Sequence, residues 1–183
     1  MAKVFEQISD ELKDFVSAQQ MYFVATAPLV ADGHVNLSPK GLDTFRILDG
    51  KTVVYLDLTG SGIETIAHLK ENGRIVLMFC AFAGSARIVR FHGVGTTYER
   101  GSAEFDELAQ LFGEFPSARA VIRVAIKRIS DSCGYGVPLY EFNGQRETLP
   151  KYVAQFTPDQ LHEARRQKNA QSLDGLPGLG FDD

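Results

Sequence analysis

The stretch Lys51–Lys70, KTVVYLDLTGSGIETIAHLK, decides the fold because it joins a strand to a helix through a glycine-rich turn. β-Branched and aromatic residues fill Thr52–Leu56 and favour an extended strand, which the Asp49-Gly50 turn introduces. Apolar residues then recur at helical spacing, at Ile63, Ile66, Ala67 and Leu69. The stretch therefore predicts a strand over 51–58 and a helix over 61–70.

The ends of this helix are marked by short polar signals. Ser61 and Glu64 have the spacing of a capping box, in which each side chain bonds the backbone of the other residue. Asn72-Gly73 is typical of a helix C-terminus. The helix is therefore expected to begin at Ser61.

On both sides of this stretch, short strand-like runs alternate with turn residues. A hairpin is predicted over 21–38 across Asp32-Gly33, and further strands over 74–82, 86–98 and 117–130. Helices are predicted over 5–19, 102–112 and 159–169. This order favours a mainly β fold, an antiparallel barrel with flanking helices, over a doubly wound parallel sheet.

Composition describes an ordinary globular chain. Its 183 residues fit one compact domain plus a tail, and its net charge of −4 argues against nucleic-acid binding. No apolar run approaches the ~20 residues that cross a bilayer, and no signal peptide is indicated. Cys80 and Cys133 lie far apart, which favours a cytoplasmic protein without disulfides, and the histidines have no metal-ligand spacing.

Three polar segments point to a phosphate-bearing ligand. They are Asn36–Gly41 (NLSPKG), Thr59–Thr65 (TGSGIET) and the strand that carries Arg87 and Arg90. A helix N-terminus offers free N–H groups to an anion, and glycine lets the backbone approach closely. Gly60-Ser61-Gly62 falls short of a dinucleotide fingerprint, so one compact phosphate site is expected.

Taken in order, these segments and Ser132–Pro138 (SCGYGVP) resemble the pyridoxamine 5′-phosphate oxidase-related flavin-binding proteins over roughly residues 15–140. The resemblance implies a split β-barrel that forms a homodimer, with FMN at the subunit interface. The cofactor-binding residues that it implies are Asn36, Leu37, Ser38, Lys40, Asp57, Leu58, Thr59, Ser61, Gly62, Arg87, Ile88 and Arg90.

Two departures separate this chain from the authentic oxidase. The oxidase carries a basic Ser-Arg-Lys turn where this chain has Ser61-Gly62-Ile63, and a glutamine where this chain has Ile88. No match to the part of the oxidase that binds pyridoxamine phosphate follows. The resemblance is therefore to a separate oxidase branch, and flavin binding requires other groups to replace two phosphate-binding cations.

Several alternatives stay open on the sequence. The chain is expected to be an FMN-binding oxidoreductase of unknown substrate. The alternatives are a flavin reservoir without turnover and a deazaflavin- or haem-binding protein on the same fold. Ser61 and Glu64 could serve only as a cap. Arg87 and Arg90 lie three apart on a strand, so they face opposite sides and at least one can be structural. No catalytic residue is assigned.

The chain is expected to divide into a flavin-binding domain over 1–140 and a C-terminal helix and arm over 141–183. The arm alternates apolar residues with Gly175, Pro177, Gly178 and Gly180, which prevent a helix. Left in water it would expose apolar surface, so it is expected to cross onto a partner subunit.

Overall fold

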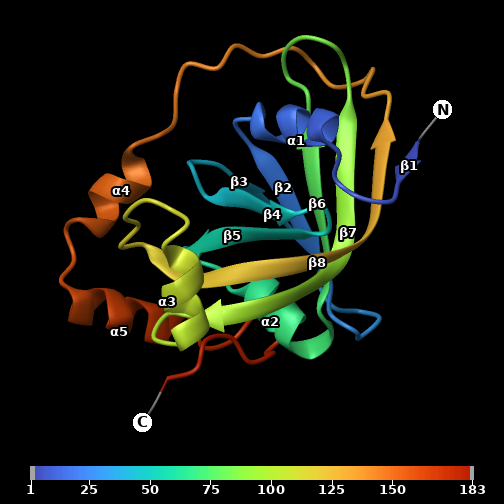
Figure 1. Ribbon diagram of the computed structural model, residues 1–183. Helices are drawn as coiled ribbons and strands as arrows, with labels where there is room; N and C mark the ends of the chain where they lie inside the picture. Colours follow the sequence, from blue (N-terminus) through green and yellow to red (C-terminus); the bar gives the residue numbers. More distant parts are fainter. Residues whose placement is uncertain (1–2, 182–183) are drawn as a thin grey trace.

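The computed structural model describes residues 3–181, and within them eight strands form one antiparallel sheet (Figure 1). The sheet order is β3-β2-β6-β7-β8-β5-β4, and β1 pairs with β8 off this path. The strands are β1 (Val4–Phe5), β2 (Tyr22–Thr26), β3 (Asn36–Lys40), β4 (Phe45–Asp49), β5 (Thr52–Leu58), β6 (Arg74–Cys80), β7 (Ile88–Glu99) and β8 (Ala118–Ser132). The expected antiparallel, mainly β architecture is therefore confirmed.

The sheet closes on itself through a cluster of aromatic rings. The ring centroid of Phe45, on edge strand β4, lies 5.3 Å from that of Tyr22 on β2 and 5.2 Å from that of Phe79 on β6. Tyr55 and Phe91 extend this cluster and are fully buried. Because strands from distant parts of the sheet order meet here, the sheet encloses its core as a barrel does.

Five helices flank the sheet in the described chain: α1 (Asp10–Ser17), α2 (Glu64–Asn72), α3 (Ala103–Ala109), α4 (Thr148–Val153) and α5 (Pro158–Asn169). Leu12 of α1 and Ile66 of α2 are fully buried in the barrel core. Phe105 of α3 belongs to a second, smaller apolar cluster with Val54 and Val121 of β5 and β8. The helices therefore cover the barrel with their apolar faces.

The N-terminal region differs from its prediction. A helix was expected over 5–19, but Phe5 pairs with Ile129 in the sheet and α1 begins only after Ser9. The Ser9 hydroxyl accepts a hydrogen bond from the Leu12 amide, as an N-cap residue does. The helical spacing of Phe5 and Ile8 was therefore coincidental.

The capping box that was expected between Ser61 and Glu64 does not form at the start of α2. Ile63 occupies the N-cap without a side-chain cap bond, and the helix begins at Glu64 rather than at Ser61. The Glu64 carboxylate instead accepts a hydrogen bond from the Leu173 amide in the C-terminal segment. Gly73 ends the helix in the left-handed conformation, as predicted.

Strand β4 and helix α4 were not anticipated, whereas the hairpin of β2 and β3 and helix α5 were. Between β8 and α4 a long segment arcs across the top of Figure 1 to reach α4 at the left. Most of its side chains are exposed.

Residues 171–181 pack on the chain's own barrel rather than reaching outward. Leu179 belongs to the barrel core and Phe181 packs against it, while the Lys70 ammonium bonds the Gly178 carbonyl. Gln171 and Pro177 form an isolated antiparallel bridge that folds the segment back. An arm that crosses onto a partner subunit was expected, whereas these residues pack on their own chain. Residues 182 and 183, the last two of the expected arm, lie outside the described residues.

Candidate functional site

A polar cavity of about 320 Å³ opens between β3, the β5–α2 connection and β8. Its walls come from segments that are far apart in the sequence. The lining residues are Asn36, Ser38, Lys40, Leu58, Gly60, Ser61, Gly62, Glu64, Thr65 and Arg119. The structure therefore brings together two of the three polar segments that the sequence singled out.

Strand β3 turns alternate side chains toward this cavity. Asn36, Ser38 and Lys40 line it, whereas Leu37 lies on the other face and is 63% exposed. Successive side chains of a strand point to opposite faces, so the NLSPK pattern places its polar residues on one side. Of the site residues expected on this strand, Leu37 does not reach the cavity.

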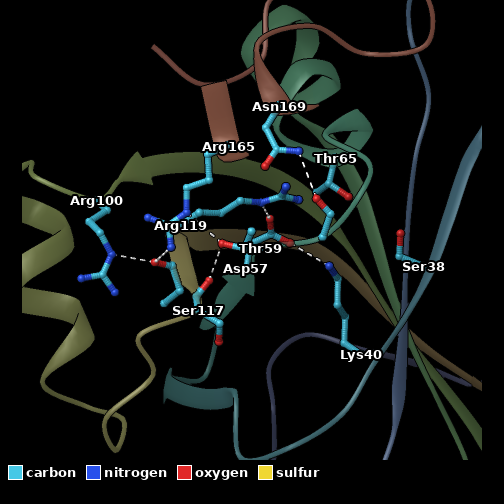
Figure 2. A network of polar contacts seen from close by, with 12 residues as sticks. Ser38, Lys40, Asp57, Thr59, Thr65, Arg100, Ser117, Arg119, Arg165 and Asn169 are labelled. Carbon is cyan, nitrogen blue, oxygen red and sulfur yellow. Dashed lines mark hydrogen bonds and ion pairs between the residues drawn. The ribbon is translucent and has the colours of Figure 1, made fainter. Parts of the chain in front are cut away.

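Asp57 is the electrostatic centre of the site. Its carboxylate is fully buried and accepts a bond of 2.7 Å from Lys40 Nζ and one of 2.8 Å from Arg119 Nε (Figure 2). Burial alone would raise the pKa of Asp57, but the charges of Lys40 and Arg119 outweigh it and hold the pKa below 3.8. Asp57 is therefore ionised, and the three groups together carry a net positive charge.

Arg119 has spare hydrogen-bonding capacity at the cavity wall. The residue is only 5% exposed and lines the cavity, yet its Nη1 has no hydrogen-bond partner. A buried guanidinium nitrogen without a partner is costly, and an anionic oxygen would satisfy it. The sequence reasoning placed Arg119 on a strand and missed it as a site residue.

The turn between β5 and α2 forms another wall. Ser61 and Gly62 line the cavity, and α2 starts beside them at Glu64. The amides of its first turn lack intrahelical partners, so they favour an anion there. The Glu64 carboxylate also lines the cavity and opposes an anion, although it accepts a bond of 3.2 Å from the Leu173 amide.

Two further arginines lie behind this turn. Arg165 of α5 donates from Nε to the Thr59 hydroxyl at 2.8 Å, and Arg100 donates from Nε to the Ala118 carbonyl at 2.7 Å. Figure 2 shows both side chains converging with Arg119 on the ends of β5 and β8. Burial, together with the charges of Arg100 and Arg119, lowers the pKa of Arg165 to about 10.

A hydrogen-bond chain fixes the amide of Asn36. Asn36 Nδ2 donates to the hydroxyls of Thr26 and Thr65, and Asn36 Oδ1 accepts from the Ser38 hydroxyl. The Thr26 hydroxyl is 2.9 Å from Nδ1 of His68, which is fully buried. Burial lowers the pKa of His68, which favours the neutral ring in this chain of bonds.

The third polar segment lies elsewhere in this chain. Arg87 pairs with Glu11 and Asp131, and Arg90 donates from Nη1 to the Ser132 hydroxyl at 3.0 Å. Neither these arginines nor Ile88 lines the polar cavity. The ion pairs of Arg87 give it a structural role, which its spacing of three residues from Arg90 on one strand allowed.

A larger cavity of about 1030 Å³ adjoins the first and shares Lys40 with it. Its walls include Phe82, Tyr140, Phe142 and Tyr152, and the last three belong to the long segment and α4. These three side chains remain 63%, 55% and 49% exposed, respectively. The wall that the long segment forms is therefore only partly packed on this chain.

Metal and membrane sites can be addressed for residues 3–181. No group of three or more His, Cys, Asp or Glu side chains is arranged there to hold a metal ion. None of the helices in that range combines the length and apolar character that a membrane crossing requires. Cys80 is buried and Cys133 exposed, and both are free thiols.

Comparison with known proteins agrees with this architecture. The family model "Pyridoxamine 5′-phosphate oxidase" matches residues 8–133. The pyridoxamine 5′-phosphate oxidase family protein ustO of Aspergillus flavus is 39% identical over 96% of this chain and 77% of its own length. The crystal structure of HupZ from Group A Streptococcus is 28% identical over 67% of this chain and 91% of its own, with a TM-score of 0.52.

Proposed function

The chain belongs to the pyridoxamine 5′-phosphate oxidase family, and from this premise we propose that it binds FMN and acts as a flavin-dependent oxidoreductase. The observation that carries the proposal is the unpartnered Nη1 of Arg119, a buried residue that lines a cavity together with Lys40 and Ser61. A phosphate oxygen supplies the partner that this nitrogen lacks.

The charge of the site fits a phosphate group. Lys40 and Arg119 contribute two positive charges, and Asp57 neutralises one of them. The start of α2 and the Ser61 hydroxyl add donors without adding charge. Arg119 from β8 thereby replaces cations that the authentic oxidase carries in its Ser-Arg-Lys turn.

The size of the cavity favours FMN over FAD. At about 320 Å³ it has room for one phosphate group and part of its sugar chain. A dinucleotide cofactor needs a second phosphate-binding feature, and the sequence lacks the glycine fingerprint that supplies it in other folds. We therefore propose a single terminal phosphate in the polar cavity and the flavin ring toward the larger cavity beyond Lys40.

When bound, the flavin supplies the redox chemistry, since its ring exchanges electrons with a substrate. The protein binds and orients it. Lys40 and Arg119 neutralise the phosphate, and Asn36 presents an amide whose orientation three hydroxyls fix. Because the flavin performs the reaction, no acid or base in the chain is required.

We also propose that the protein acts as a homodimer. The long segment and α4 leave Tyr135, Tyr140, Phe142 and Tyr152 between 49% and 85% exposed, and a second copy would cover such a group of rings. Light scattering of wild type and of the double variant Tyr140→Ser/Phe142→Ser tests this. We expect a dimer that the double variant weakens, and a monomeric wild type would refute it.

The visible spectrum of the purified protein tests the proposal directly. We expect two absorption bands of a flavin, which bleach under anaerobic dithionite and return with air. A Soret band identifies haem, and a colourless protein that takes up no flavin contradicts flavin binding.

A further inference from the structure

Two of the three side chains that helix α5 buries are polar. Its buried side chains are Leu161, Arg165 and Asn169, which lie four residues apart on one face. Buried polar groups cost free energy unless hydrogen bonds satisfy them, so a stripe of this kind is a poor choice for packing alone. The hydrogen-bond partners of Arg165 and Asn169 therefore indicate the role of α5.

Those partners are the two loops that border the polar cavity. Arg165 Nε donates to the Thr59 hydroxyl, and its Nη2 donates to the carbonyls of Pro116 and Ala118 at 3.2 and 3.3 Å. Asn169 Nδ2 donates to the Gly60 carbonyl at 3.1 Å. One face of α5 thus bonds the end of β5 and the start of β8 at once (Figure 2).

These bonds act on the residues that define the site. Thr59 already bonds the Ser117 carbonyl through both its amide and its hydroxyl, and Arg165 secures this junction from outside. Asp57 and Arg119 lie two residues before Thr59 and one residue after Ala118, respectively. A shift of either loop would alter the Asp57–Arg119 pair and the position of Ser61.

The arginine also raises the positive potential behind the cavity. Burial is the largest cause that lowers the pKa of Arg165, and the nearby charges of Arg100 and Arg119 lower it further. Like charges held together in this way favour the arrival of an anion, because the anion relieves their repulsion. Both the bonds and the charge of Arg165 therefore support phosphate binding.

We propose that Arg165 is a positioning residue for the flavin phosphate, through which α5, outside the residues that the family model matches, organises the anion site. It acts through Thr59 and the start of β8 and does not itself line the cavity. This inference rests on the proposed FMN site. It predicts that loss of Arg165 weakens recognition of the phosphate and leaves recognition of the flavin ring intact.

Affinities for FMN and riboflavin, which differ by the phosphate, separate these effects. Wild type is expected to prefer FMN by roughly tenfold or more, since a phosphate adds at least one charge-assisted hydrogen bond. Arg165→Met should lose about tenfold of this preference while riboflavin binding stays within about twofold. The matched control Lys168→Met removes an exposed cation from the same helix and should keep the preference.

A second variant guards against a folding defect. Thr59→Val removes the acceptor of Arg165 Nε and retains the arginine, and it should reduce the FMN preference in the same direction. If both folded variants keep the wild-type ratio, or if both ligands weaken equally, Arg165 is not a positioning residue for the phosphate. A wild type that binds FMN no better than riboflavin contradicts the phosphate site itself, which is a distinct result.

Discussion

The substitution Arg119→Met probes the site most sharply because Arg119 serves both the fold and the proposed cofactor. Its guanidinium is 5% exposed and pairs with a fully buried Asp57. Removal of one partner of a buried ion pair costs about 3–5 kcal/mol of unfolding free energy. Lys40 still neutralises Asp57, so we expect the lower end of that range, about 3 kcal/mol.

The same substitution should weaken FMN binding. Loss of one charge-assisted hydrogen bond costs about 1.5–3 kcal/mol, which corresponds to roughly 10- to 150-fold in dissociation constant. Urea unfolding of the apoprotein gives the first quantity, and quenching of flavin fluorescence gives the second. The matched control Arg123→Met removes an exposed arginine from the same strand and should change neither by much.

The stability and the FMN affinity of Arg119→Met together separate the two roles of Arg119. If Arg119→Met is folded and its FMN affinity stays within about twofold of wild type, the unpartnered nitrogen does not face the phosphate. A loss of stability without a loss of affinity would confine Arg119 to the fold. Equal losses in Arg123→Met would indicate a general effect of net charge.

Three further predictions follow from named contacts. Because the pKa of Asp57 is lowered on folding, its ionised carboxylate contributes stability above pH 3.8, and this contribution is lost as the pH falls through the pKa of the folded state. In Asp57→Asn the free energy of unfolding should therefore depend less steeply on pH in this acid range, as urea unfolding at several pH values will measure. Lys40→Ala should weaken FMN binding by about 1–3 kcal/mol, as titration will measure. Arg90→Ala should bind FMN as wild type does, because Arg90 does not line the polar cavity. A Cβ at Gly178 would collide with the backbone carbonyl oxygen of Asn169 in α5, so Gly178→Ala should lower the melting temperature. Gly180→Ala should not, because the nearest atom to its Cβ would be a carboxylate oxygen of Glu99 at 3.8 Å.

Local patterns in the sequence predicted much of the fold. The hairpin of β2 and β3 and the strand β5 were readable because β-branched runs and an Asp-Gly turn act over a few residues. Helix α1 was predicted too long because Phe5 fits a helical period and still pairs in the sheet. Tertiary pairing overrides a local period wherever an edge strand is available.

The site was only partly readable for a related reason. Asn36, Ser38 and Lys40 could be recognised because their strand alternates polar residues on one face. Arg119 could not, since it meets Asp57 across 62 residues through the pairing of β5 and β8. The register of two distant strands leaves no mark in either strand alone.

Charge alone does not reveal whether a cation already has a partner. Arg87 stood out as part of a basic cluster, but Glu11 and Asp131 neutralise it. Arg165 lies in a helix that is charged on nearly every side, so no pattern marked it as buried. The apolar tail was correctly expected to pack against a surface, and the core that accepts Leu179 belongs to its own chain.

FMN binding is measured most directly by identifying the cofactor that the purified protein carries. Protein purified without added flavin, then heat-denatured and cleared by centrifugation, releases its cofactor for chromatography against FMN, FAD and riboflavin standards. We expect FMN in an amount close to one molecule per chain. Recovery of FAD in that amount, or of no flavin from a protein that also fails to take up added FMN, would contradict this expectation.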